Sequence, residues 1–298
     1  MILRSADVIP EFTAMVILSA NKDSLELIIF LLMIPVFIYR AIIDLETPMV
    51  KRHLKKYLFL RNLEKKYRPF LSRNFPFYNS LDQKEKGKFE RRVQKFIDIK
   101  QFIPRGGLKE ITAEMKAMIA ACAVQMTYGY PDVYFRHFWR ILIYPDNYYS
   151  SITHKYHKGE VNVRGLIVLS WNSFLDGFRY PNDGQNLGYH EMAHALRLIN
   201  IVENEEYDFW DRGIMKKFEG EAKNETLKIL NSKKGTSFFR EYCLTNLDEF
   251  FAVAVENFFE RPAALKEYNP VIYELLTKIL KTDPAAVMAP SQAARMIS

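Results

Sequence analysis

Two histidines and a glutamate stand close together in the stretch His190-Glu191-x-x-His194. Residues four apart lie on nearly the same face of an α-helix, so both imidazoles can reach one metal ion. Glu191 is turned about 100° from His190 and therefore lies beside such an ion rather than on it. This spacing is typical of a metallopeptidase, in which the glutamate takes a proton from a water activated by the metal.

A five-residue pattern of this kind also arises by chance, and the alternative is a polar helix face that happens to carry two histidines. The neighbouring residues favour the metal. Ala193, Ala195, Leu196 and Ile199 follow the spacing of a helix that is buried on one side. Two histidines and a glutamate held against a core need a partner there, and a metal ion would supply it.

A metal site of this type needs a third protein ligand and an open position for water. The segment 247–259 is almost wholly apolar, and its Glu249 and Glu256 stand seven residues apart, on one face of a helix. A carboxylate on a buried helix must be neutralised by a partner. Thr245 and Asp248 stand near the spacing of a capping box, which gives Asp248 a structural role. Glu249 is therefore the candidate third ligand.

The residues alone leave the roles of two further side chains open. Glu256 is either an acceptor for a ligand imidazole or a buried ion-pair partner. Tyr242 is a candidate donor to an oxyanion, although 17 tyrosines give its position little weight. The remaining histidines are weaker ligand candidates, because they lie in a polar loop, in a basic run or beside aromatic residues: His154, His157, His53 and His137.

Composition describes a globular chain with one unusual stretch. Its 298 residues are 49% hydrophobic and 14% aromatic, enough for one large domain or a medium one with appendages. Two cysteines, Cys122 and Cys243, exclude a disulfide framework and a cysteine-based zinc site, and we expect buried thiols in a reducing compartment. The net charge of +7 is concentrated in residues 51–73, which hold nine basic residues and one acid.

A hydrophobic run covers residues 25–43, directly before that basic run. Its length just suffices to cross a bilayer, and the following cations indicate a cytoplasmic flank that also contacts anionic headgroups. We expect an anchor in the inner, cytoplasmic membrane with the catalytic domain in the cytoplasm. The alternative is an apolar helix packed on a soluble cytoplasmic protein. Because no nucleic-acid-binding module accompanies the basic run, no nucleic-acid partner is expected.

The sequence predicts strands at 139–144 and, in a hairpin-like arrangement, at 161–169. Helical spacing predicts helices at 84–98, after Thr112, and at 171–178, 247–259 and 270–280. The predicted organisation has five parts: an N-terminal segment (1–23), a transmembrane or hydrophobic anchor helix (24–44), a basic juxtamembrane linker (45–73), a metallopeptidase domain (74–284) and a flexible tail (285–298).

Several separated motifs, in the same order, carry a resemblance to a known family. They are Phe75-Pro76-Phe77-Tyr78, the segment 91–96, Gly106-Gly107-Leu108, Tyr144-Pro145, the segments 168–171, 183–187 and 189–194, Tyr242, and the segment 248–253. From about residue 75 to residue 283, the chain resembles the Mlc titration factor A (MtfA) family of zinc-dependent metallopeptidases. The resemblance implies an α+β fold: a mostly helical zincin-type domain with a small β-sheet, similar to the catalytic domain of anthrax lethal factor.

The resemblance also assigns roles to residues. It implies one Zn²⁺ ion held by His190, His194 and Glu249, with Glu191 as general base and Tyr242 as hydrogen-bond donor in the transition state. One departure concerns position 197.

The family usually has an acidic residue three positions after the second histidine, and this chain has Arg197. If that acid orients a ligand imidazole, Glu256 or a main-chain group must replace it here. The expected function is zinc-dependent peptide hydrolysis, aminopeptidase-like as in the family, with the 161–169 region as a candidate edge for pairing with an extended peptide. The alternative is a membrane-tethered regulatory protein that sequesters a cytoplasmic partner such as a transcriptional repressor.

Overall fold

The computed structural model describes residues 29, 31–36, 61–150, 154–202, 204, 206, 208–233, 235 and 237–287. The chain divides into two compact units, Met1–Phe59 and Leu60–Ser298. In the first unit residues 31–36 are helical, and the rest of the expected anchor 24–44 lies, apart from residue 29, outside the described residues. The parts 1–23 and 288–298 lie outside them as well. A search of the described residues finds no helix that is both long and apolar enough to cross a membrane.

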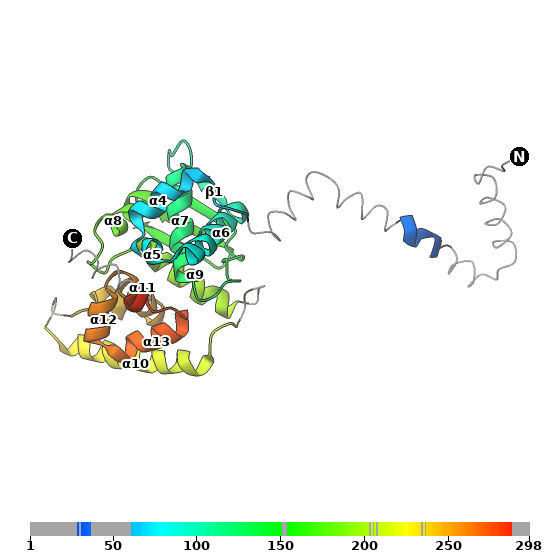
Figure 1. Ribbon diagram of the computed structural model, residues 1–298. Coiled ribbons are helices and arrows are strands. Elements are labelled where there is room, and N and C mark those ends of the chain that lie inside the picture. The colour runs from blue at the N-terminus through cyan, green and yellow to red at the C-terminus, as the bar shows by residue number, and fades with distance from the viewer. Residues whose placement is uncertain are drawn as a thin grey trace, which may run out of the picture. The chain divides into compact units, whose positions relative to one another are not determined.

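The second unit is mostly helical and contains a small mixed sheet, which confirms the α+β expectation (Figure 1). Its helices are η1 (Lys65–Tyr67), α4 (Arg68–Asn74), α5 (Pro76–Ser80), α6 (Gln83–Ile99), α7 (Ala113–Met126), α8 (Trp171–Arg179), α9 (Leu187–Ile201), α10 (Arg212–Asn231), η2 (Glu241–Leu244), α11 (Leu247–Glu260), α12 (Pro262–Tyr268) and α13 (Pro270–Leu280). Its strands are β1 (Gln101–Pro104), β2 (Arg140–Tyr144), β3 (Tyr148–Ser150), β4 (Lys155–His157), β5 (Gly159–Asn162) and β6 (Leu166–Ser170).

The larger sheet has the strand order β1-β2-β6-β5. Strands β1, β2 and β6 run parallel, whereas β5 is antiparallel to β6, with Val161 opposite Ile167. The hairpin predicted at 161–169 is therefore confirmed. In β2, Ile141 and Ile143 are fully buried and alternate with more exposed neighbours, as expected for a strand with one face on the core. Strand β5 forms one edge of the sheet, and a further strand can pair with an edge of this kind.

Helices α7, α9 and α11 form the centre of the second unit. The side chain of Thr112 accepts a hydrogen bond from the backbone N–H of Met115, which confirms the predicted start of α7. Helix α9 contacts α7, α8 and α11 and lies against β5 and β6. Gly188 permits this close packing, because a Cβ atom there would lie 2.6 Å from the Phe174 ring and 3.1 Å from the Cys122 sulfur.

The packed core extends beyond both ends of the expected domain 74–284. Leu63, Tyr67 and Leu71 are at most 4% exposed and belong to the same hydrophobic cluster as α7 and α11. At the other end, Ala285 and Val287 pack against this cluster. Burial of apolar side chains thus includes residues that composition alone assigned to the basic linker and to the tail.

Part of the basic run also has acidic partners within this unit. The Arg68 guanidinium donates to both carboxylate oxygens of Glu90, at 2.9 and 2.7 Å. Arg61 makes a similar two-bond contact with Asp98. Both acids lie on α6, so these two cations hold the start of the unit against that helix rather than presenting unpaired charge.

Replacing Phe251 by alanine tests the packing between α10 and α11. Phe251 is fully buried, and its ring centroid lies 5.4 Å from that of Trp210 and 5.5 Å from that of Phe218. Truncation leaves a cavity, and we expect the free energy of unfolding to fall by about 3–5 kcal/mol in urea denaturation. Leu227→Ala is the control, because Leu227 is 59% exposed. Equal effects of the two substitutions would contradict this packing.

Candidate metal centre

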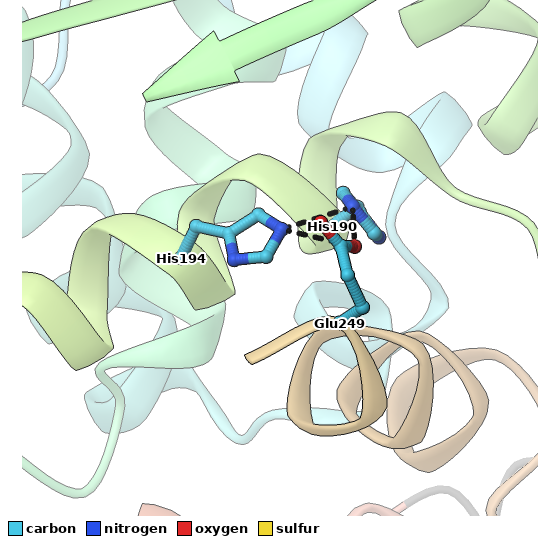
Figure 2. Close-up of side chains that lie close together, drawn as sticks. All are labelled: His190, His194 and Glu249. Carbon is cyan, nitrogen blue, oxygen red and sulfur yellow. Dashed lines mark hydrogen bonds and ion pairs between the residues drawn. The ribbon is translucent and has the colours of Figure 1, made fainter. Parts of the chain in front are cut away.

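The two histidines are placed by the N-terminal half of α9. Asn186 is the N-cap of this helix, and its side-chain oxygen accepts a hydrogen bond from the backbone N–H of Tyr189. His190 and His194 follow on the face that contacts α11, from which Glu249 reaches toward both rings (Figure 2). The close contact between α9 and α11 therefore brings the three predicted ligands together.

The three ligand atoms converge on one point. The Nε2 atoms of His190 and His194 are 3.1 Å apart, and Glu249 Oε2 lies 3.2 Å from the first and 3.4 Å from the second. Oε2 of Glu249 is buried, with no hydrogen-bond partner in the described part of the chain. Two imidazole nitrogens and one carboxylate oxygen suit a divalent transition metal. The residues present therefore fit a bound metal ion.

The charges around the cluster also favour a cation. Burial opposes a positive charge on His190, but its contacts with the carboxylates of Glu249 and Glu256 outweigh burial and raise the pKa of His190 to about 10. Burial by itself would raise the pKa of Glu249, yet its ion-pair contacts with both histidines lower that pKa far below its usual range. The carboxylates that stabilise a protonated imidazole here can stabilise a metal cation in its place.

Glu256 fills both roles that the sequence left open. Its Oε1 accepts a hydrogen bond from His190 Nδ1 at 2.7 Å, which fixes the proton on Nδ1 and leaves the Nε2 lone pair for a metal. Arg240 donates from Nη2 to the same oxygen, so Glu256 is also an ion-pair partner. Arg240 Nη2 also lies 3.2 Å from His190 Nδ1. Both nitrogens are donors, and they share Oε1 of Glu256 as their acceptor. The backbone N–H of Asn186 donates to Oε2 at 2.6 Å.

Arg197, the departure from the family pattern, takes no part in orienting a ligand. It lies on α9, and its Nη2 donates to Glu219 on α10 at 3.0 Å. Its Nε forms an ion pair with Asp248 on α11. The guanidinium also lies over the Phe251 ring. Arg197 thus joins three helices next to the metal cluster, while Glu256 supplies the acceptor for His190.

The predicted cap of α11 is wrong in detail. The N-cap is Asn246, whose side chain accepts a hydrogen bond from the backbone N–H of Glu249 at 2.9 Å. Thr245 instead donates its hydroxyl proton to the backbone carbonyl of Tyr242. Asp248 does have a structural role, but through Arg197 rather than through a capping box. The extended backbone of Asn246, with φ −168° and ψ 176°, selects this residue as the cap.

Glu191 lies beside the cluster and outside the ligand set, as predicted. It is 5% exposed, and burial raises the pKa of its carboxyl to about 7. Strand β5 passes close to this carboxylate: a Cβ atom at Gly159 would lie 2.4 Å from Glu191 Oε1. Glycine at that position therefore lets the sheet edge and the carboxylate lie together.

Tyr242 reaches the same site from η2. Its ring centroid lies 5.9 Å from that of His190, and the side chain is 52% exposed. Burial and the neighbouring Glu249 raise the pKa of the Tyr242 hydroxyl, so this group keeps its proton and can donate it in a hydrogen bond. The structure thus brings together the three predicted ligands, Glu191 and Tyr242.

Three neighbouring residues contribute to the site beyond those predicted from the sequence: Asn186, Arg240 and His157. Arg240 neutralises Glu256, and no spacing rule connects these two positions. The side chain of Asn186 donates to Glu260 Oε1 at 3.2 Å, and its place before a helix is a cap signal that could have been found. His157, which the sequence marks as a weak ligand candidate, lines two cavities beside the cluster.

Glu260 generates a prediction about pH. Burial raises its carboxyl pKa to about 7 from the ordinary 4.5, and its Oε2 is buried without a partner among the described residues. The folded state binds this proton more tightly than the unfolded state. The protonated Glu260 therefore contributes to the free energy of unfolding in full below about pH 4.5, and this contribution is lost as pH rises through 7.

We therefore expect Glu260→Gln to match the unchanged protein near pH 4.5 and to exceed its unfolding free energy at pH 8. The rise in the Glu260 pKa from 4.5 to about 7 corresponds to a difference of about 3 kcal/mol in the free energy of unfolding. Urea denaturation at both pH values, with equal metal content, measures the difference. A difference that is independent of pH would contradict the raised pKa.

Comparison with known proteins agrees with this geometry. A sequence model of the glucose-regulated metallo-peptidase M90 family matches residues 50–281. The Mlc titration factor A of Edwardsiella ictaluri is 27% identical over 232 residues, which cover 70% of this chain and 85% of the relative. That of Serratia proteamaculans is 24% identical over 237 residues, covering 73% and 88%. The uncharacterised protein slr2042 of Synechocystis sp. is 27% identical over 247 residues, covering 77% and 88%.

The matched segment contains every residue of the metal cluster, together with Glu191 and Tyr242. It also contains helices α9 and α11, which hold that cluster. The match covers well over half of the sequence, and the three relatives are matched over most of their own lengths. The chain therefore belongs to the glucose-regulated metallo-peptidase M90 family.

Proposed function

We propose that this protein is a zinc-dependent peptidase of the zincin type. The observation that carries the proposal is the convergence of His190, His194 and Glu249 on one point, with the buried carboxyl of Glu191 beside it. Two histidines and one glutamate, with a position left for water, form a ligand set of catalytic zinc. Membership of a metallo-peptidase family supports the same chemistry.

Glu191 is the general base of the proposed reaction. When bound, zinc lowers the pKa of a water that it binds and polarises the carbonyl of the peptide bond. Glu191, with a pKa of about 7, is suited to accept the proton of the attacking water near neutral pH. It then passes that proton to the nitrogen of the leaving amine. Burial under β5 keeps this carboxylate out of bulk solvent.

Tyr242 stabilises the transition state in this proposal. Attack on the carbonyl carbon develops negative charge on the carbonyl oxygen, and a donor aimed at that oxygen lowers the barrier. The raised pKa of the Tyr242 hydroxyl keeps the donor proton in place. Its position on the short helix η2, directly before α11, ties the donor to the same element that supplies Glu249.

The free edge of β5 supports a peptide substrate. An extended peptide can add as a further strand to such an edge, which places its backbone beside the carboxylate of Glu191. We propose, from the family resemblance, that the substrate presents a free N-terminus as in an aminopeptidase. A hydrophobic anchor at residues 24–44 would place the domain at the cytoplasmic face of the membrane.

A second candidate function is the binding of a regulatory protein. The relatives from Edwardsiella ictaluri and Serratia proteamaculans carry the name Mlc titration factor A. In this alternative the domain would bind a cytoplasmic partner without cleaving it. The buried carboxyl of Glu191 beside three ligand atoms is an arrangement that binding alone does not require, and it favours the peptidase.

Glu191→Gln separates metal binding from catalysis. We expect it to keep one zinc ion per chain while turnover falls by about 10²–10⁴-fold, because the amide cannot accept the proton. Zinc analysis and a peptidase assay on the same samples measure both quantities. The exposed Glu267→Gln, on α12, is the control. Undiminished turnover in Glu191→Gln would exclude this mechanism, and removal of zinc by a chelator should abolish turnover in every variant.

Tyr242→Phe tests the transition-state donor. Loss of one such donor costs about 10²–10³ in kcat, and we expect KM to change little because the bond forms mainly in the transition state. Steady-state kinetics give both constants. Tyr149→Phe is the control, since Tyr149 is also exposed and lies outside the cluster. An increase in KM with an unchanged kcat would instead assign Tyr242 to substrate binding.

A further inference from the structure

The metal cluster opens onto two cavities. One, of about 530 Å³, extends from the cluster past Tyr156 and Asp183. The other, of about 430 Å³, extends past Val161 and along the C-terminal half of α9. Both cavities adjoin the metal cluster, because they share five lining residues in and around it: His157, Gly159, His190, Glu191 and Tyr242.

The second cavity has aliphatic walls on two facing elements. Val161 and Val163 come from β5 and the turn after it, and Leu198 and Ile201 come from α9. Val163 is 62% exposed and Ile201 60%, so two large apolar side chains face solvent at the rim. The first cavity is different, because its lining includes Lys158, Asp176, Asp183 and Arg240.

The charged side chains that line the second cavity away from the metal cluster are already paired. Arg197 forms an ion pair with Asp248, and both belong to its lining. Glu160, also in the lining, accepts a hydrogen bond from the Tyr148 hydroxyl at 3.2 Å. A charged ligand group entering this cavity would have to compete with these contacts, whereas an aliphatic group gains contact with the four aliphatic side chains at no such cost.

We propose that this aliphatic cavity, formed by Val161, Val163, Leu198 and Ile201, selects an aliphatic side chain on the substrate residue just before the cleaved bond. The inference rests on the proposed peptide hydrolysis and names its substrate class: peptides with leucine, isoleucine, valine or methionine at that position. The cavity begins at the metal cluster itself, so its occupant is the residue adjoining the reacting carbonyl.

The direction of the substrate follows from β5. This strand pairs antiparallel with β6 on one side. Antiparallel pairing is slightly more stable than parallel pairing, so we assign an antiparallel orientation, relative to β5, to a peptide on its other edge. Gly159, beside Glu191, marks the position of the cleaved bond along the strand. The N-terminal part of an antiparallel peptide then runs toward the C-terminal end of β5, where Val161 and Val163 lie.

Two peptides that differ only in leucine or asparagine before the cleaved bond test the proposal on the zinc-loaded full chain. Their side chains are similar in size, and we expect kcat/KM to favour leucine by on the order of 10- to 100-fold. Val163→Ser and Ile201→Ser should each reduce this preference several-fold. Val271→Ser, at a 50% exposed valine on α13, is the matched control and should leave the preference unchanged.

Three results would overturn the proposal. The first is equal kcat/KM for the two peptides, and the second is a leucine preference that Val163→Ser and Ile201→Ser leave unchanged. The third is a preference for leucine at the residue after the cleaved bond instead. A binding measurement distinguishes failure of this proposal from failure of the proposed peptidase function. It compares the affinity of the two peptides for the Glu191→Gln variant by fluorescence anisotropy. Leucine-selective binding that the two serine variants abolish, without cleavage by the unchanged protein, would support the cavity and reject the peptidase. Cleavage of both peptides without leucine selectivity would support the peptidase and reject the role of the cavity.

Discussion

Three carboxylates on one face of α11 hold the histidine-bearing helix α9 in place, and the site depends on this contact. Glu249 meets both histidines, Glu256 accepts from His190 Nδ1 and from the backbone of Asn186, and Glu260 accepts from the Asn186 side chain. They stand at spacings of seven and four residues, which a helix places on one face. The same face therefore supplies a ligand, orients a second ligand and secures the start of α9.

Burying three acids together is costly unless each has a partner. Arg240 and His190 partner Glu256, whereas Oε2 of Glu249 has no hydrogen-bond partner in the described region and lies between two imidazoles. A bound cation removes this deficit, so metal binding and stability of the α9–α11 contact are linked. Because a ligand that binds only the folded state stabilises it, metal occupancy will strengthen the same contact that creates the site.

The residues that a sequence identifies well are those fixed by local spacing. His190, Glu191 and His194 share one turn, and Glu249 is conspicuous because a carboxylate interrupts an apolar helix. The partners of Arg197, on α10 and α11, follow from how three helices pack, and no local pattern encodes that packing. The cap of α11 was assigned to Thr245 rather than Asn246 because both are good cap residues and only backbone conformation decides between them.

Gly159 shows how the sheet and the helices combine into one site. As part of an edge strand it leaves one side of β5 open for pairing, and lacking a side chain it lets that strand approach Glu191. Any larger residue would push either the strand or the carboxylate away, and in the proposed peptidase this would separate the strand edge that aligns a peptide from the general base. Since a displacement of about 1 Å at a reacting group can cost about 10²-fold in rate, the proposed reaction depends on this contact between β5 and Glu191.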